Sequence, residues 1–335
     1  MSAEPIFFKL HSQLGIRTVS FGGDGTSNSG VKFGAHTVLG NDKVPARAPQ
    51  TELFPSPAPL TQYEFPDARI YREELPKSHG LGRKRRIDKY LDKVAEHSKE
   101  VKELIVKTVG DQETHYGGPL TVVAIGGDHS IGFPVLAAML ERHDVDKTAV
   151  VSFDSHFDVC TRENSPSGNF HGQWLTPFLV NDFGHEGIDA LVPEILPGKN
   201  LIYVGNLRGE PHYTPAEESL LVEQGVEVYG KEVLEHNMPA VQAYLAQKLT
   251  GYDHVHVTFD IDVFHGANAP GTGIAGDWGL TPKHIAPVLE TIAQSAKTLS
   301  LTLAEVNPEK DDAFGSTLFY AQQVIETLLY TETTE

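Results

Sequence analysis

One stretch of the sequence, residues 148–158, constrains the fold and the chemistry of this chain most strongly. Its first part, residues 148–153, is mostly apolar and predicts a buried strand. Asp154, His156 and Asp158 then follow at alternate positions. On an extended backbone, alternate side chains point to the same face. The spacing therefore predicts that three metal-binding side chains leave the end of this strand on one side.

Two carboxylates in this position point to a bound cation. Buried carboxylates repel each other, and each costs several kcal/mol to desolvate without a partner, so placing them together requires a compensating positive charge. Carboxylate oxygens combined with an imidazole suit a divalent ion such as Mn, Fe, Co, Ni or Zn. The ordinary alternative is a capping Asp154, a chance His156 and a surface Asp158, and the triplet alone does not exclude it.

Two further apolar runs end in residues of the same kind. Residues 121–125 are followed by Gly-Gly-Asp-His-Ser, and residues 254–259 are followed by Asp-Ile-Asp. Sites in open α/β sheets form at the carboxyl ends of the strands. We therefore expect six ligands to converge there: His129, Asp154, His156, Asp158, Asp260 and Asp262. Four carboxylates and two imidazoles suit two divalent ions about 3.5–4 Å apart, bridged by shared carboxylates.

In this order, the three motifs resemble the ureohydrolase superfamily, which includes arginase, agmatinase, guanidinobutyrase and formimidoylglutamase. Ser155 is a mild departure, because the second motif of the family is usually Asp-Ala-His-x-Asp. Residues 167–172 resemble the Ser-Gly-Asn-x-His-Gly loop of arginase, and residues 304–308 contain the family's final Glu-Val-Asn-Pro. The resemblance spans about residues 120–330, and the N-terminal segment 1–80 is less typical.

The order of expected elements agrees with the fold that the resemblance implies. Strands alternate with helices over the last two thirds of the chain, which indicates a parallel sheet between helices. Strands are expected over 6–10, 17–21, 121–125, 148–153, 200–205, 226–229, 254–259 and 300–304. Helices are expected over 85–109, 133–142, 239–250, 282–296 and 314–330, with a further start at 214. The proline-rich residues 43–78 predict irregular surface chain.

No internal repeat or shift in composition divides the sequence. We therefore predict one ureohydrolase domain over residues 1–335, of the α/β class. The expected architecture is a three-layer α/β/α arginase-like fold with a central, mainly parallel sheet.

Composition limits the classes of partner that this protein is expected to bind. The net charge of −18, from 27 basic and 45 acidic residues, argues against binding to nucleic acid or an anionic membrane. It favours a cationic substrate, although a solvated acidic surface explains it equally well. The single cysteine, Cys160, excludes an intramolecular disulfide. The sequence has neither an apolar run long enough to span a membrane nor a secretory signal, so a cytoplasmic location is expected.

The resemblance also implies a role for each site residue. One ion would be bound by His129 and Asp158 and the other by His156 and Asp262, with Asp154 and Asp260 bridging. His171 would carry a proton to the departing amine, and Glu305 would accept hydrogen bonds from the guanidinium group of the substrate. We assign His171, Glu305 and Asp158 to the catalytic set, with Asp128 as a supporting neighbour. Relatives usually use Mn²⁺, although two histidine ligands leave Ni²⁺ and Co²⁺ open, and they form trimers or hexamers.

The features that select a substrate tail are mixed. Ser167 and Asn169 match arginase, but Cys160 stands where arginase has an Asn that binds the α-carboxylate. Arg162 could pair with a substrate carboxylate, as an Arg of formimidoylglutamases does in this region. Glu210 lies near the sequence position where arginases have an acidic residue that binds the amino group of the substrate. An acidic residue at the protein surface is the equal alternative.

Four other residues have expected roles outside the ligand set. Cys160 is expected to line the site, because a low-pKa thiol would need a cationic neighbour. His254 and His256, within a strand, are expected to be packed or hydrogen bonded. His265 replaces a family Asp, and we expect it to change only a loop hydrogen bond, with an imidazole beside the cluster as the alternative.

These observations lead to one functional hypothesis and several alternatives. The protein is expected to be a binuclear metal-dependent hydrolase that cleaves a C–N bond of a small guanidino compound, giving urea and an amine by means of a metal-bridging hydroxide. Arginine, agmatine, guanidino acids and guanidine-type compounds are the candidate substrates. The alternatives are a formimidoylglutamase that releases formamide, a non-catalytic metal-binding subunit, and a histone-deacetylase-like amidohydrolase with one zinc and different motifs.

Overall fold

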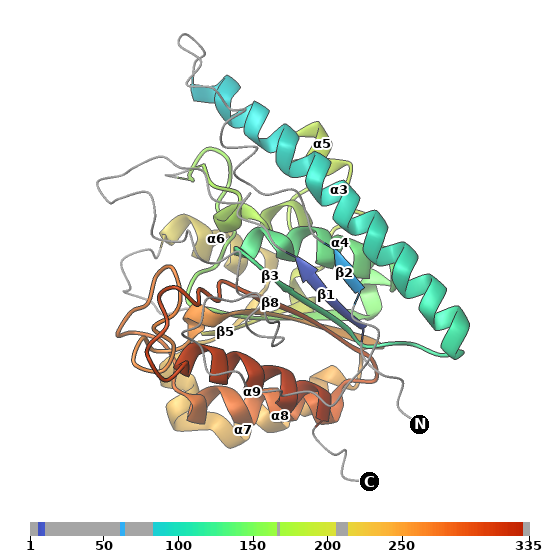
Figure 1. Ribbon diagram of the computed structural model, residues 1–335. Helices are drawn as coiled ribbons and strands as arrows, with labels where there is room; N and C mark the ends of the chain where they lie inside the picture. The colour runs from blue at the N-terminus through green and yellow to red at the C-terminus, as the bar shows by residue number, and fades with distance from the viewer. Residues whose placement is uncertain (1–5, 11–60, 64–82, 166–167, 206–213, 331–335) are drawn as a thin grey trace.

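An all-parallel sheet of eight strands forms the centre of the computed structural model, which describes residues 6–10, 61–63, 83–165, 168–205 and 214–330 (Figure 1). The strand order is β2-β1-β3-β8-β7-β4-β5-β6, and neighbouring strands pair in parallel throughout. The strands are β1 (Ile6–Leu10), β2 (Thr61–Tyr63), β3 (Val122–Gly126), β4 (Thr148–Asp154), β5 (Leu201–Gly205), β6 (Glu227–Tyr229), β7 (His254–Asp260) and β8 (Leu299–Ala304).

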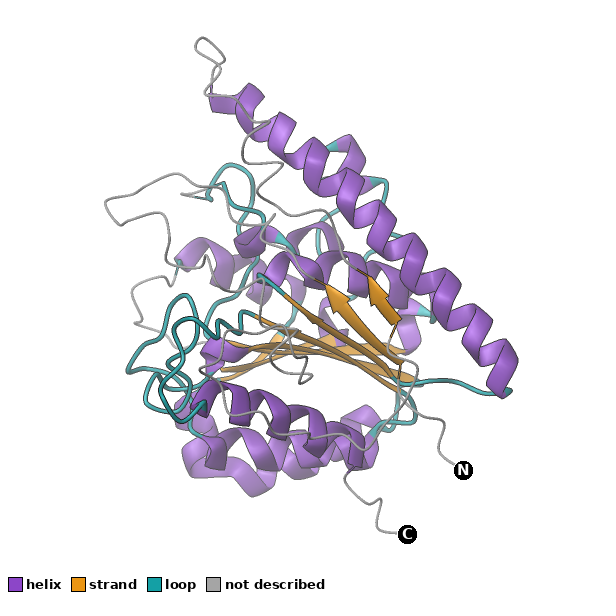
Figure 2. Cartoon of the chain, in the orientation of Figure 1, coloured by secondary structure: helices purple, strands orange, loops and turns teal. Residues whose placement is uncertain are grey.

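Helices cover both faces of the sheet, which gives three layers (Figures 1 and 2). One outer layer contains α7 (Lys231–Leu249), α8 (Pro282–Ser295) and α9 (Ser316–Tyr330). The helices on the other side are α3 (Arg83–Tyr116), α4 (Gly132–Arg142), α5 (Glu186–Asp189) and α6 (Pro215–Gln224). No helix of the described residues is long and apolar enough to cross a membrane.

Strand alternation divides the core between the two faces. Leu301 of β8 packs in one hydrophobic cluster with Val288 of α8 and Ile325 of α9. Val150 of β4 packs in another with Phe133 of α4. These side chains are fully buried. Because both faces of the central strands are covered, their sequences are nearly continuous apolar runs, as in other parallel sheets.

The expected α/β/α fold is confirmed, and the predicted elements within the described residues are found, with shifted ends. Helix α7 begins at Lys231, eight residues before its expected start at Pro239. It continues past this proline through a kink at Asn237 (φ −131°, ψ 19°), because a helix can bend where proline removes a backbone donor. Helix α3 likewise extends beyond the predicted range 85–109.

Two predictions for the N-terminal part have different outcomes. Residues 43–78 were expected to be irregular throughout, which is wrong at Thr61–Tyr63, where β2 pairs with β1 at the edge of the sheet. An edge strand this short carries too little periodicity to be recognised from sequence. The strand expected over 17–21 lies outside the described residues, and the assignment of residues 1–335 to one domain stays a prediction.

Replacement of a central core side chain should measure how strongly the sheet depends on this packing. Leu301→Ala removes three buried carbons from β8 between the sheet and α8 and should lower the free energy of unfolding by about 2–5 kcal/mol. Val222→Ala on α6, where the side chain is 70% exposed, is the control and should change stability by no more than about 0.5 kcal/mol. Urea unfolding of the metal-free proteins measures both, and equal stability of the two variants would contradict the assignment of Leu301 to the core.

Candidate metal centre

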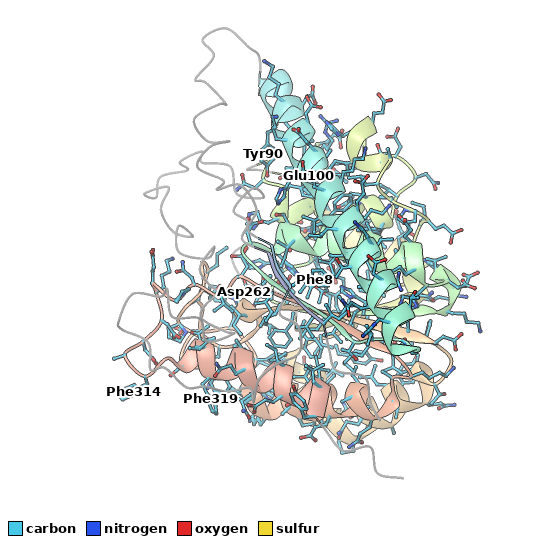
Figure 3. The ribbon with its side chains drawn as sticks, turned by 45° about the vertical axis from the view of Figure 1, so that its right-hand side comes forward. Phe8, Tyr90, Glu100, Asp262, Phe314 and Phe319 are labelled. Carbon is cyan, nitrogen blue, oxygen red and sulfur yellow. The ribbon has the colours of Figure 1, made fainter. Side chains whose placement is uncertain are left out.

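The predicted ligands gather at the carboxyl ends of neighbouring central strands. His129 follows β3, while Asp154 and Asp260 are the last residues of β4 and β7. Strand β8 lies between β3 and β7, and Glu305 follows it directly. Asp262, labelled in Figure 3, follows the last residue of β7 by two positions. The sheet topology therefore brings together residues that are up to 176 positions apart.

Two groups of ligands meet at one shared carboxylate. In the first, Nδ1 of His129 lies 3.0 Å from Oδ2 of Asp154, 2.9 Å from Oδ2 of Asp158 and 3.3 Å from Oδ2 of Asp260. In the second, Nδ1 of His156 lies 3.1 Å from Oδ2 of Asp262 and 3.5 Å from Oδ1 of Asp154. Each group can hold an ion, one through His129, Asp154 and Asp158 and the other through Asp154, His156 and Asp262.

The backbone reaches this arrangement differently from the extended one expected. Strand β4 ends at Asp154, because its Oδ1 accepts a hydrogen bond from the backbone N–H of His156 at 2.7 Å and turns the chain. At the end of β7, Oδ1 of Asp260 accepts in the same way from the N–H of Asp262 at 2.9 Å. The expectation that alternate residues of an extended strand form the site is therefore wrong. Aspartate side chains favour such local turns over strand continuation.

Backbone strain is concentrated at the centre. Among the described non-glycine residues, only Asp158 (φ 55°) and Glu305 (φ 63°) adopt left-handed conformations. Such a conformation costs about 1–3 kcal/mol and persists only where surrounding contacts enforce it. At Glu305 one such contact is the hydrogen bond that its backbone N–H donates to the carbonyl of Gly127, at 2.8 Å. Both strained residues belong to the predicted catalytic set.

The charges of the cluster strongly perturb its histidines. Burial alone would lower the pKa of His129, but contact with Asp154, Asp158 and Asp260 raises it well above its ordinary value. His156 behaves likewise: burial opposes protonation, while Asp262 and Asp154 raise its pKa. The carboxylates therefore attract positive charge, and binding of a cation here should release protons.

Two observations show that the side chains suit a bound cation. Nδ1 of His129 and Oδ2 of Asp154 are buried and lie 3.0 Å apart, yet neither makes a hydrogen bond of acceptable geometry among the described residues. The other ring nitrogen of His129 lies 2.8 Å from the hydroxyl of Thr258, an interaction that fixes the ring and leaves Nδ1 facing the carboxylates. Nitrogen and oxygen donors oriented in this way fit a divalent transition metal.

The two residues assigned to substrate chemistry lie beside the first group. Oε1 of Glu305 accepts a hydrogen bond from the N–H of His129 at 3.1 Å and lies 3.6 Å from Nδ1 of His171. Burial lowers the pKa of His171, but the nearby Glu305 carboxylate outweighs it and the pKa is raised. Burial, together with the charge of Glu305, raises the pKa of Asp128 to about 6, and this side chain also accepts from the N–H of Ser130.

Two of the expected tail-binding residues, Arg162 and Asn169, lie among the described residues beside partners within the chain. The Arg162 guanidinium pairs with Asp88 of α3 and donates to the carbonyl of Gly184. Asn169 accepts a hydrogen bond from the Gln173 side chain at its backbone carbonyl, at 2.8 Å. Ser167 and Glu210 lie outside the described residues.

The remaining polar residues singled out in the sequence have structural partners. Burial, followed by the charge of Glu217, raises the pKa of the Cys160 thiol, which therefore stays protonated. His254 and His256 are buried, and both lie 2.8 Å from the hydroxyl of Ser300. Burial lowers the pKa of His256 to about 3. The His265 ring accepts a hydrogen bond from the N–H of Ala267 at 3.1 Å, within its own loop.

Two residues at the centre were missed by sequence reasoning. Thr258 orients His129, and its place two residues before Asp260, on the same face of β7, is a signal that could have revealed it. The Trp174 indole donates to Oδ2 of Asp158 at 3.1 Å. No periodicity or known motif connects these two residues, so only the folded chain shows the contact.

Comparison with known proteins agrees with this geometry. The family model described as "Arginase family" matches residues 12–330. The chain belongs to the arginase family. Members of this family are binuclear metal-dependent amidinohydrolases that act on C–N bonds, and the resemblance to ureohydrolases is thereby confirmed.

Individual relatives are distant. The chain is 32% identical to the arginase of Bacillus caldovelox over 198 residues, which cover 57% of this chain and 62% of that protein. The matched region thus spans less than two thirds of the relative. Among solved structures, arginase from Bacillus subtilis superposes with a TM-score of 0.68 at 20% identity, covering 99% of this chain and all of the other. Formimidoylglutamase from Bacillus subtilis gives 0.64 at 19%, covering 98% and 87%. Likeness at this level of identity shows the fold alone.

The sharing of Asp154 leads to a distinct metal-content prediction. Asp154→Asn should abolish metal binding in both groups, because Asp154 belongs to both. Asp158→Asn and Asp262→Asn should each lose one of about two equivalents of metal per chain, because each residue belongs to one group only. Asp253→Asn, an exposed carboxylate paired with Lys297, is the control and should retain both. Elemental analysis after metal loading and dialysis measures the content. Retention of both equivalents by Asp154→Asn would exclude a bridging role.

Proposed function

We propose that this protein is a binuclear metal-dependent hydrolase that converts a small guanidino compound into urea and an amine. The principal observation is that Asp154 contributes one oxygen to each ligand group, while Glu305 links the first group to His171. These residues offer ligands suited to two cations, together with a carboxylate and a titratable imidazole, and this combination supports the proposal.

We assign complementary tasks to the chain's own residues. Divalent cations bound in such a centre supply Lewis-acid polarisation and lower the pKa of a water molecule. The Glu305 carboxylate is suited to accept charge-assisted hydrogen bonds from guanidinium N–H groups, which would orient the planar carbon toward the ligands. Water adds to this carbon, the bond from the carbon to the alkyl-bearing nitrogen breaks, and the proton that completes the amine passes through His171.

The balance of the reaction requires that proton transfer. A substituted guanidinium ion and one water molecule give urea and an alkylammonium ion, so the departing nitrogen must gain a proton as the C–N bond breaks. His171 is 23% exposed in its side chain and lies against Glu305, so it can exchange protons with solvent and deliver them at the site. The raised pKa of His171 favours the protonated form that this donation needs.

Release of formamide from a formimino substrate is the second candidate. It would use the same cation site, and a formimidoylglutamase shares the fold. The expected anchor for a glutamate-like tail was Arg162, but its guanidinium is engaged by Asp88 and Gly184. This pairing favours the guanidino reading. A non-catalytic binding subunit is the third candidate, and intact ligands in both groups argue against it.

Further expectations accompany this function. Mn²⁺ suits the oxygen-rich ligand set, with Ni²⁺ and Co²⁺ as alternatives. We also propose a cytoplasmic, homo-oligomeric enzyme, a trimer or hexamer, that binds neither membrane nor nucleic acid. Size-exclusion chromatography with light scattering measures the oligomeric state directly.

A substrate panel tests the proposed reaction. Arginine, agmatine, guanidinobutyrate, guanidinopropionate, free and methylated guanidine, and formiminoglutamate are incubated with protein loaded with Mn²⁺, Ni²⁺ or Co²⁺. Urea from one guanidino compound, well above the rest, is the expected outcome. Formamide from formiminoglutamate without urea from any compound would establish the second candidate instead, and metal binding without either product would support the third.

The assigned proton carrier has its own test. His171→Asn should lower kcat by about 10²–10⁴-fold, because proton transfer to the departing nitrogen is lost, while the metal content remains that of the wild type. His236→Asn, a histidine on the exposed side of α7, is the matched control. A normal kcat in His171→Asn would assign the proton transfer to another group.

A further inference from the structure

Trp174 connects the metal centre to the segment that carries His171. Its side chain is fully buried, and its indole N–H donates to Oδ2 of Asp158 at 3.1 Å. The same ring lies against the imidazole of His129, with 4.9 Å between ring centroids. One side chain thus contacts two ligands of the first group.

Further hydrogen bonds fasten the two segments together. The carbonyl of Asp158 accepts from the N–H of Leu175 at 3.3 Å, and the N–H of Cys160 donates to the carbonyl of Gly172 at 3.1 Å. The Thr176 hydroxyl donates to the carbonyl of Cys160 at 2.8 Å. We refer to residues 172–176 packed on residues 158–160 as the Trp174 clamp. Within it, the Trp174 side chain reaches the carboxylate of Asp158.

Asp158 needs such support. Its left-handed backbone (φ 55°) is unfavourable for a residue with a Cβ atom, so the loop after β4 would relax without external contacts. Relaxation would rotate the carboxylate away from Nδ1 of His129, now 2.9 Å away. Contacts on both the carbonyl and the carboxylate of Asp158 oppose that movement.

The indole itself has little freedom. A Cβ atom added to Gly132, the first residue of α4, would lie 2.9 Å from the Trp174 ring. The ring therefore packs directly on the backbone at the start of α4, three residues after His129. A side chain larger than hydrogen at position 132 would displace it.

We propose that Trp174 is a positioning residue that holds Asp158 and His129 in the geometry of the first metal-ligand group and couples this group to the His171 segment. The proposal rests on the metal centre of the proposed function. An indole suits the task, because it donates one uncharged hydrogen bond and does not neutralise the carboxylate. The remaining lone pairs of Asp158 stay available to a cation. Interactions of this kind orient ligands and raise metal affinity.

Metal titration of the apoprotein tests the proposal without any substrate. Trp174→Phe keeps most of the ring and removes the N–H donor. Calorimetric titration with Mn²⁺ should show one site weakened by about 10–100-fold and the other unchanged. Trp278→Phe, at the chain's other tryptophan, is the matched control and should bind as the wild type does. Unchanged affinity at both sites in Trp174→Phe, or equal weakening at both, would overturn the proposal.

A second measurement applies even if Trp174→Phe fails to fold. The chain has two tryptophans, so ¹⁵N-labelled protein gives two indole resonances, which Trp278→Phe assigns. Asp158→Asn, which weakens the acceptor of the indole, should shift the Trp174 resonance and speed its hydrogen exchange. Asp262→Asn, in the second ligand group, should leave the resonance in place. An unchanged Trp174 resonance in Asp158→Asn would overturn the proposal.

The two experiments separate failure of the inference from failure of the proposed function. Metal binding with the expected site-selective loss, but without urea release, would retain the clamp and reject the reaction. No metal binding by the wild type would reject the metal centre, and the resonance experiment would still decide whether Trp174 holds Asp158.

Discussion

Mutual repulsion between buried carboxylates is the constraint on which the site depends. Asp154, Asp158, Asp260 and Asp262 all lie at the ends of central strands with little exposure to solvent. Their charges raise the pKa values of His129 and His156. Without a metal ion, the same negative charge that would bind a cation therefore favours protonation of these two histidines. Because the carboxylates are buried, water does not screen their repulsion, and a divalent cation would offset it. The parallel sheet makes this concentration of charge unavoidable, because it aligns the ends of all these strands at one edge.

The supporting structure is organised to keep these charges in place. Strain at Asp158 and Glu305 is maintained by hydrogen bonds from segments distant in sequence. Thr258 holds one ring nitrogen of His129, and Trp174 holds the carboxylate of Asp158. Glu305 contacts both the backbone of His129 and the ring of His171. The predicted ligands, His171 and the strand ends are therefore connected by direct contacts.

The ligand groups could be proposed from the sequence because their residues lie at the ends of apolar strands or within four positions after them. Asp154 and Asp260 end their strands, and the parallel topology could be inferred from the alternation of elements. The local conformation was predicted wrongly, because hydrogen bonds from His156 and Asp262 to the aspartate side chains end the strands early. The start of α7 was also misplaced, since Pro239 is accommodated by a kink that sequence cannot foresee.

Residue identity and spacing alone specified the metal-binding residue types, the parallel sheet and the edge at which they meet. These are properties of hydrophobic periodicity and of charges that cannot be buried unpaired, and both are local in sequence. Tertiary packing decided the rest. Three features depend on contacts between segments that are distant in sequence, and no repeating sequence pattern indicates these contacts. They are the pairing of Arg162 with Asp88, the division of the two Asp154 oxygens between the ligand groups, and the hydrogen bond from Trp174 to Asp158. A pairwise distance in the folded chain is set by the packing of whole layers, and no single segment encodes it.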